Sequence, residues 1–244
     1  MPTSSIVVAM VAAVMTLGPA ASVGAATTPP ASPPPIAVQV TGTTVGRPIA
    51  PGFIGFSFEY PAVREYTGPN PRAINPVLVQ LIRNLTPNQS PVLRIGGNSA
   101  DQTWWPLPGV KRSPSIKTTL NSSWLATTRE LAVRTGGRLI LDLNLKLDSA
   151  AEITAESQAF RTGIGTRNIA AMEIGNEPEL YPIAPFYYKE PGHRPVYPRP
   201  RSYNRAAYVK EMTKFAPLLH GFALAGPATG YIYWLARLPK LFTV

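Results

Sequence analysis

An amide and a carboxylate, Asn176 and Glu177, follow a short apolar run at residues 169–174. The run has the length of a buried strand, and Pro178 ends it because proline cannot donate a backbone hydrogen bond. In a parallel α/β barrel, catalytic groups lie at the carboxyl ends of the strands. The pattern therefore favours Glu177 as a residue that does chemistry, although an ordinary polar turn is the simpler interpretation of these residues alone.

Similar polar side chains occur at the ends of three other apolar runs. These residues are Glu59, Asn98, Asp142 and Asn144. Carboxylates and amides at one edge of a sheet suit a ligand with many hydroxyl groups, because each accepts or donates hydrogen bonds at fixed angles. Trp104 and Trp105 offer an apolar platform for the face of a sugar, with core or loop packing as the alternative. For Asn98 and Asn144, the alternative is that they satisfy the backbone of nearby turns.

The order of apolar and amphipathic segments predicts an α/β fold with a parallel sheet and helical crossovers. The predicted strands are 53–58, 91–95, 138–145, 169–174 and 222–225. Helices are predicted at 74–85, at 124–133, from 149 onward and at 208–219. One apolar face of the first helix is formed by Ile74, Val77, Leu78, Leu81, Ile82 and Leu85. In the third helix, Ser149 and Glu152 have the spacing of a capping box.

The first 35 residues are typical of a leader and a linker. Residues 6–17 form an apolar segment that is too short to span a bilayer comfortably. The pattern resembles a secretory signal peptide over 1–26, although no Lys or Arg precedes Arg47. Residues 27–35 form a Pro-rich linker. We therefore expect a secreted, extracellular protein without stable membrane insertion.

Composition argues against several kinds of site. The chain of 244 residues has no Cys, so it has no disulfides and no Cys-ligated zinc. His193 and His220 lie in different contexts, and Gly96-Gly97 lacks the spacing of a dinucleotide-binding loop, so we expect no metal and no cofactor. The net charge of +10 favours an anionic partner, but no nucleic-acid-binding motif occurs. The charge is clearest at 189–205, which is either a surface for an acidic glycan or a solvated loop.

Three segments occur in the same order as motifs of a known enzyme family. They are Phe-Ser-Phe-Glu at 56–59, Leu-Arg-Ile-Gly-Gly-Asn-Ser at 93–99 and Glu-Ile-Gly-Asn-Glu-Pro at 173–178. On these motifs the chain resembles glycoside hydrolase family 79, which includes heparanases and β-glucuronidases, and it is most similar to the bacterial β-glucuronidase branch. The resemblance implies a retaining hydrolase with a (β/α)8 TIM barrel and an added β-sandwich. It also implies a glucuronide or acidic oligosaccharide as the substrate.

The resemblance assigns roles to individual residues. Glu177 matches the general acid/base, and Asn176 matches the amide that contacts the sugar beside the cleaved bond. Arg94 resembles an Arg that lies near the nucleophile, with pairing to Asp142 as its structural alternative. The other predicted substrate contacts are Glu59, Asn98, Asn144 and Asp101.

One group that the family needs is missing from the sequence. The family's nucleophile is a Glu at the end of the seventh strand. The Glu residues after Glu177 are Glu179, Glu190 and Glu211, all in predicted loops or a helix. A complete barrel usually needs about 250 residues. We therefore expect 51–244 to be the N-terminal part of a truncated, inactive barrel, with 36–50 supplying one strand of the β-sandwich.

Two other interpretations stay open, and the oligomeric state is not predicted. A non-catalytic secreted module that binds acidic glycans would keep the cationic segment and the Trp pair without needing Glu177. Glycan binding that does not depend on Glu177 separates this module from a hydrolase. A gene remnant that never folds is the other interpretation, since half a barrel leaves an open sheet edge.

Overall fold

The computed structural model describes residues 42, 46–47, 52–232 and 234. The predicted signal peptide at 1–26 and linker at 27–35 lie outside these residues, and so does most of the predicted sandwich strand at 36–50. The chain divides into two compact units, 1–46 and 47–244, and the fold below belongs to the second. Within the described ranges, no helix is long and apolar enough to cross a membrane.

Five parallel strands form the main sheet, in the order β1-β2-β5-β6-β9. Their bounds are β1 Gly55–Phe58, β2 Val92–Ile95, β5 Arg138–Leu143, β6 Ile169–Ile174 and β9 Leu224–Ala225. The spatial order follows the chain, so every crossover moves in the same direction, and right-handed crossovers then place the helices on one face. Strands β1 and β9 do not pair with each other. The sheet over the described residues is therefore open, which is consistent with part of a TIM-barrel-like fold.

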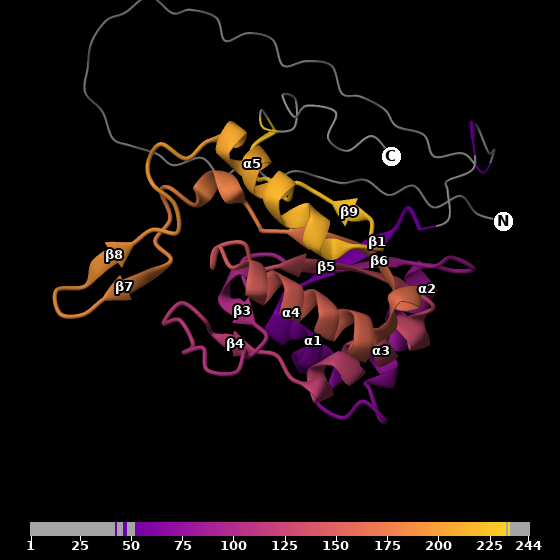
Figure 1. Ribbon diagram of the computed structural model, residues 1–244. Helices are drawn as coiled ribbons and strands as arrows, with labels where there is room; N and C mark the ends of the chain where they lie inside the picture. The colour runs from indigo at the N-terminus through magenta and orange to yellow at the C-terminus, as the bar shows by residue number, and fades with distance from the viewer. Residues whose placement is uncertain (1–41, 43–45, 48–51, 233, 235–244) are drawn as a thin grey trace, which may run out of the picture. The chain divides into compact units, whose positions relative to one another are not determined.

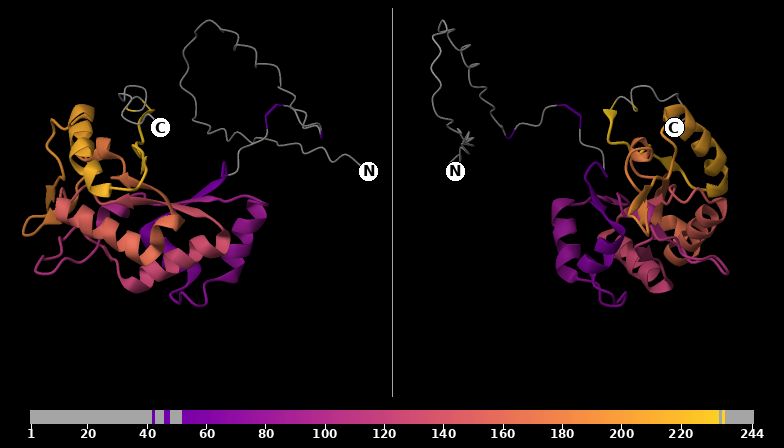
Figure 2. Two further views of the ribbon diagram at one scale, coloured as in Figure 1. Left: turned by 45° about the vertical axis from the view of Figure 1, so that its right-hand side comes forward. Right: turned by 90° about the vertical axis from the view of Figure 1, so that its left-hand side faces the viewer.

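Helices connect these strands. They are α1 Tyr60–Thr67 and α2 Pro76–Leu85 before β2, α3 Ser122–Thr135 before β5, α4 Ala150–Phe160 before β6 and α5 Arg205–Phe215 before β9. Two small ladders pair β3 Thr103–Trp104 with β4 Thr118–Thr119, and β7 Tyr187–Lys189 with β8 Arg194–Val196. Figures 1 and 2 show α1 to α4 gathered along one side of the sheet, and Figure 1 shows the β7–β8 hairpin extending away from them. The predicted α/β class and parallel sheet are confirmed, whereas helix α1 and the two small ladders were not predicted.

Alternation along the strands separates an apolar face from a polar one. Leu93, Leu141 and Met172 are fully buried in a core that they share with helix residues. Full burial of such a side chain contributes about 1.5–3 kcal/mol to stability. The neighbouring positions Arg94 and Glu173 point to the opposite face and pair with each other there. The apolar face therefore fixes the strands, and the other face is left to carry polar groups.

Only part of the predicted apolar face of α2 packs as expected. Val77, Leu81 and Leu85 are 63%, 55% and 57% exposed, whereas Val79 and Ile82 are buried. Apolar residues occupy so much of this helix's circumference that periodicity alone does not select the stripe that meets the core. The tertiary contacts select the stripe that contains Val79, Ile82 and the partly buried Leu78.

The predicted capping box at the start of α4 forms only in part. Ser149 Oγ accepts a hydrogen bond from the Glu152 N–H at 3.2 Å, as expected. The Glu152 carboxylate does not complete the box, because its Oε1 accepts from the Trp105 N–H at 2.6 Å. This N–H belongs to a segment 47 residues earlier in the chain. A tertiary hydrogen bond thus replaces the local one that the spacing predicted.

Candidate functional site

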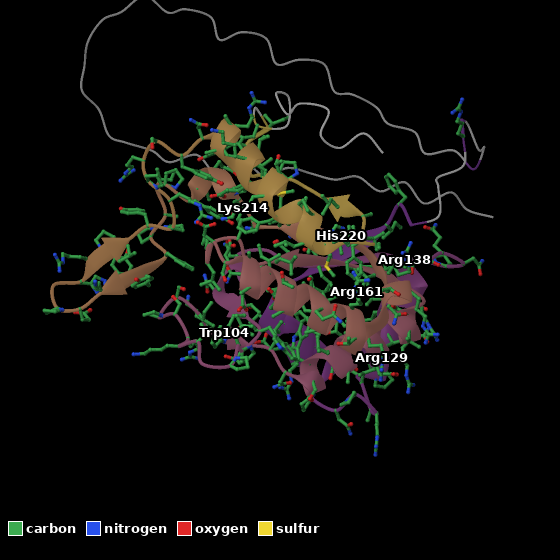
Figure 3. All side chains as sticks on the ribbon, in the orientation of Figure 1. Trp104, Arg129, Arg138, Arg161, Lys214 and His220 are labelled. Carbon is green, nitrogen blue, oxygen red and sulfur yellow. The ribbon has the colours of Figure 1, made fainter. Side chains whose placement is uncertain are left out.

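A cavity of about 460 Å³ lies where the strands of the main sheet end. Its lining residues are Glu59, Arg94, Gly97, Asn98, Glu173, Asn176, Glu177, Pro227, Ala228 and Thr229. Figure 3 shows the two ends of the sheet, with Arg138 at the start of β5 on one side and Trp104, beyond the end of β2, on the other. Five of the seven predicted site residues line the cavity, all except Asn144 and Asp101.

Arg94 joins the polar groups at the base of the cavity. Its Nε donates to Glu173 Oε2 at 2.6 Å, and its Nη2 lies 3.4 Å from Asp142 Oδ2. Burial raises the pKa of both carboxyls, although Arg94 opposes the shift. The pairing with Asp142 is the structural alternative that the sequence left open for Arg94. Glu173 was not predicted as a site residue, and its signal was a carboxylate inside an otherwise apolar strand.

The Asn176 amide is oriented by this network. Its Oδ1 accepts from Arg94 Nη2 at 3.2 Å, so its Nδ2 must face the other way. The Nδ2 lies 3.3 Å from Asn98 Oδ1 and 3.5 Å from Glu177 Oε2. The amide thus links the Arg94 network to the candidate acid, and its donor group points toward the cavity side.

Glu177 is held in an unusual backbone conformation. Its φ is +46°, in the left-handed region that non-glycine residues rarely adopt. Its N–H donates to Ala228 O at 2.6 Å, which ties the strand end to the loop after β9. A Cβ on Gly230 would lie 2.6 Å from Glu177 Oε1, so the carboxylate occupies space that only glycine leaves open. Such strain at a cavity is typical of a functional position.

Glu179, two residues further on, supports the same wall of the cavity. Its side chain is 7% exposed, and its Oε1 accepts from the backbone N–H groups of Gly230 and Tyr231. The sequence placed Glu179 in a loop without a role. Only the fold shows that it anchors the segment that reaches the cavity through Thr229.

Glu59 lines the cavity but is largely occupied by protein donors. It accepts from the N–H groups of Asn98 and Ser99, at 3.2 and 2.8 Å, and from the Ser99 hydroxyl. A Cβ on Gly97 would collide with the Glu59 carboxylate, and Gly97 has a φ of +81°. The second glycine of the Gly96-Gly97 pair therefore lets the loop close around Glu59.

The structure places Asn144 and Asp101 away from the cavity, in contrast to the predicted substrate contacts. Both are fully buried. Asn144 Nδ2 donates to Thr103 O at 2.7 Å, and its Oδ1 accepts from the Leu147 N–H at 3.2 Å. This satisfaction of nearby backbone is the alternative that the sequence left open. Asp101 accepts from the Tyr181 hydroxyl at 2.9 and 3.0 Å.

The Trp pair and the cationic segment also lie outside the lining of the cavity. Trp104 is buried, its Nε1 donates to Thr119 Oγ1 at 3.1 Å, and it offers no sugar platform in the cavity that holds Glu177. Within 189–205, Arg199 is buried and its Nε donates to Glu211 Oε1 at 2.6 Å. The segment therefore serves partly as a structural ion pair.

Replacing Asp101 with Asn is expected to flatten the pH dependence of stability. Burial raises the pKa of Asp101 to about 6, from an ordinary value of 3.8, although Lys146 opposes the shift. The native state thus keeps a proton that the unfolded chain has lost, and stability falls as pH rises from about 4 to about 6. The loss is on the order of 3 kcal/mol, since each unit corresponds to about 1.4 kcal/mol.

Urea unfolding at pH 4, 5, 6 and 7 measures this effect. The wild-type chain should lose stability across the range, and Asp101→Asn should lose markedly less. Asp148→Asn is a suitable control, because the Asp148 side chain is 50% exposed. Equal slopes for Asp101→Asn and wild type would show that Asp101 titrates normally.

No family model matches the chain, and no curated protein matches it. Among solved structures, the chain is similar to a 4-O-α-L-rhamnosyl-β-D-glucuronidase from Fusarium oxysporum 12S in complex with Rha-GlcA, at 20% identity and a TM-score of 0.48. The similarity covers 72% of this chain and 37% of that one, so the chain spans little more than a third of the neighbour's length. Within the described residues, no cluster of three or more His, Asp or Glu could hold a metal ion.

Proposed function

We propose that the cavity binds a sugar, and that Glu177 is the general acid/base of a glycoside hydrolase of the β-glucuronidase type. The position of the Glu177 carboxylate carries the proposal. It is half-buried, lies at the end of β6, and borders a cavity of about 460 Å³, a typical size for a small-molecule site. The family resemblance of the segments at 56–59, 93–99 and 173–178 also supports it.

The proposed reaction uses Glu177 to deliver a proton to the leaving oxygen as the glycosidic bond breaks. The Asn176 amide, whose Oδ1 is fixed by Arg94, offers its N–H groups to a sugar hydroxyl beside that bond. Retention then requires a second carboxylate about 5 Å away, which attacks the anomeric carbon. Both groups would have to face the same bound sugar.

Neither of the other two carboxylates in the lining is free to attack. Glu173 is held by Arg94 at 2.6 Å, and Glu59 is held by the loop at Asn98 and Ser99. This supports the expectation, made from the sequence, that the chain does not carry the nucleophile. We therefore propose that the chain alone shows no β-glucuronidase turnover above background.

The preference for a uronic acid rests on charge outside the cavity. The lining contains three carboxylates and one guanidinium, Arg94, which is already paired. The chain as a whole carries +10, and Lys189 and Arg194 are exposed on the β7–β8 hairpin. A sugar carboxylate would be drawn by these cations rather than by the base of the cavity.

Phenyl β-glucuronide is expected to bind the chain about tenfold more tightly than phenyl β-glucoside. The attraction between the net positive charge of the chain and the uronate supports this preference, and a tenfold change corresponds to about 1.4 kcal/mol. Calorimetry or ligand-observed NMR with each compound measures the difference. Equal affinities would exclude the uronate preference and would indicate a site for neutral sugars.

The exposed hairpin favours a second candidate function, a secreted module that binds acidic glycans without catalysis. Tyr188 stacks on His193 with ring centroids 4.2 Å apart, and Lys189 and Arg194 lie beside them. Retention on immobilised heparin distinguishes the candidates. The module predicts retention that is lost in a Lys189→Gln/Arg194→Gln variant and unchanged in Glu177→Gln.

A further inference from the structure

A second, smaller cavity lies between the segment after β3 and the first turn of α4. Its volume is about 220 Å³. Its walls include Trp104, Leu107, Val110, Leu147, Ser149 and Glu152. None of these residues lines the cavity that holds Glu177. The volume equals roughly seven times the ~30 Å³ that a water molecule occupies in the liquid, so a chain of several heavy atoms fits.

One side chain in this cavity has a free polar atom. Glu152 is 2% exposed, and its Oε1 accepts from the Trp105 N–H. Its Oε2 makes no hydrogen bond within the described chain. This oxygen is not fully enclosed by protein and keeps some contact with solvent. The remaining access of this oxygen is therefore through the cavity that Glu152 lines.

The charge of Glu152 is not balanced by the protein. No ion pair in the described part of the chain involves Glu152. Lys111 lines the cavity but is exposed and does not pair with it. Glu156, one helical turn further on, is fully buried with neither oxygen hydrogen-bonded. A buried carboxylate without a cation is costly, and a bound cation would remove that cost.

We propose that this cavity binds a primary alkylammonium group, with the ammonium on Glu152 Oε2 and the alkyl chain against the apolar walls. A lysine side chain of a peptide has this chemistry. An anion is disfavoured because it would face Glu152 directly. A sugar is disfavoured because the walls are mainly apolar and offer few polar partners.

Binding should also change the ionisation of Glu152. Burial raises the pKa of Glu152 to about 7. The charged or titratable groups that face it are Glu156 on the same helix and Lys111 across the cavity. An ammonium beside Oε2 favours the ionised form, so ligand should lower this pKa.

Titration of the whole chain with n-pentylammonium chloride at pH 7.5, followed by NMR of carboxyl-labelled Glu, tests the proposal. One Glu signal should shift with saturation, and that signal should be absent in Glu152→Gln, which can still accept from Trp105. The affinity of the Glu152→Gln variant for n-pentylammonium should be at least tenfold lower than that of the wild-type chain. Glu65→Gln is the matched control, since Glu65 is exposed, and it should bind as wild type does.

Two further measurements test whether the positive charge of the ligand drives binding in this cavity. Val110 is 52% exposed, so Val110→Lys should fold normally and weaken n-pentylammonium binding by placing a cation at the cavity. n-Pentanol, which has the same chain without the charge, should bind at least tenfold more weakly than the ammonium. Equal binding of the two compounds, or unchanged binding in both variants, would overturn the proposal.

Discussion

Glu177→Gln is expected to slow the azide-dependent cleavage of ethyl β-glucuronide by about 10²–10⁴-fold, the usual contribution of general acid catalysis. Azide stands in for the nucleophile that the chain is expected to lack. It forms a C–N bond at the anomeric carbon as the C–O bond breaks, and Glu177 gives its proton to the departing ethoxide. Because Gln cannot donate that proton, the variant should stall on this poor leaving group.

4-Nitrophenyl β-glucuronide provides the contrast, since its leaving group needs little protonation. Its azide-dependent cleavage should fall much less in Glu177→Gln. Glu190→Gln, with a side chain that is 73% exposed, should behave as wild type does on both substrates. Equal losses on the two substrates would remove Glu177 from the acid role. Turnover of either substrate without azide would instead show that a nucleophile is present in the chain.

Arg94→Met is expected to cost about 3 kcal/mol of stability at pH 8, at the low end of the range for breaking a buried ion pair. The low end applies because the Arg94 side chain is 25% exposed. The substitution leaves Glu173 and Asp142 without the guanidinium that pairs with both. Since burial already raises the pKa of each carboxyl, both protonate more readily as pH falls, and the loss should be smaller at pH 5.

A double-mutant cycle with Glu173→Gln isolates this effect. Arg94→Met/Glu173→Gln should regain about 1–2 kcal/mol of stability relative to Arg94→Met, because one unpaired charge is gone. The effects of two substitutions on stability are not additive when the residues are in contact. Urea unfolding of the four proteins at pH 5 and pH 8 gives the coupling energy. Additive losses at both pH values would mean that the two side chains do not depend on each other.

The sequence is sufficient to predict the main sheet and its order of elements. The run at 169–174 matches β6 residue for residue, because an apolar strand has a local signature in length and composition. The capped start of the helix at Ser149 and the helix that contains Trp124 are also local patterns. The sequence also predicts that Asn98, Asn176 and Glu177 lie together, because parallel strands bring their carboxyl ends to one edge of the sheet.

Tertiary structure alone decided which polar groups face the cavity and which are consumed by the protein. Asp101 and Asn144 follow strands as Asn98 and Asn176 do, yet they are fully buried against Tyr181 and Thr103. Partners 41 and 80 residues away in sequence cannot be inferred from local spacing. Contacts between residues far apart in the sequence also decide three other features. They are the stripe of α2 that packs, the partner of the Glu152 carboxylate and the anchoring role of Glu179. Periodicity and residue type limit the possible contacts of a side chain, but the chain's path in space determines which contact forms.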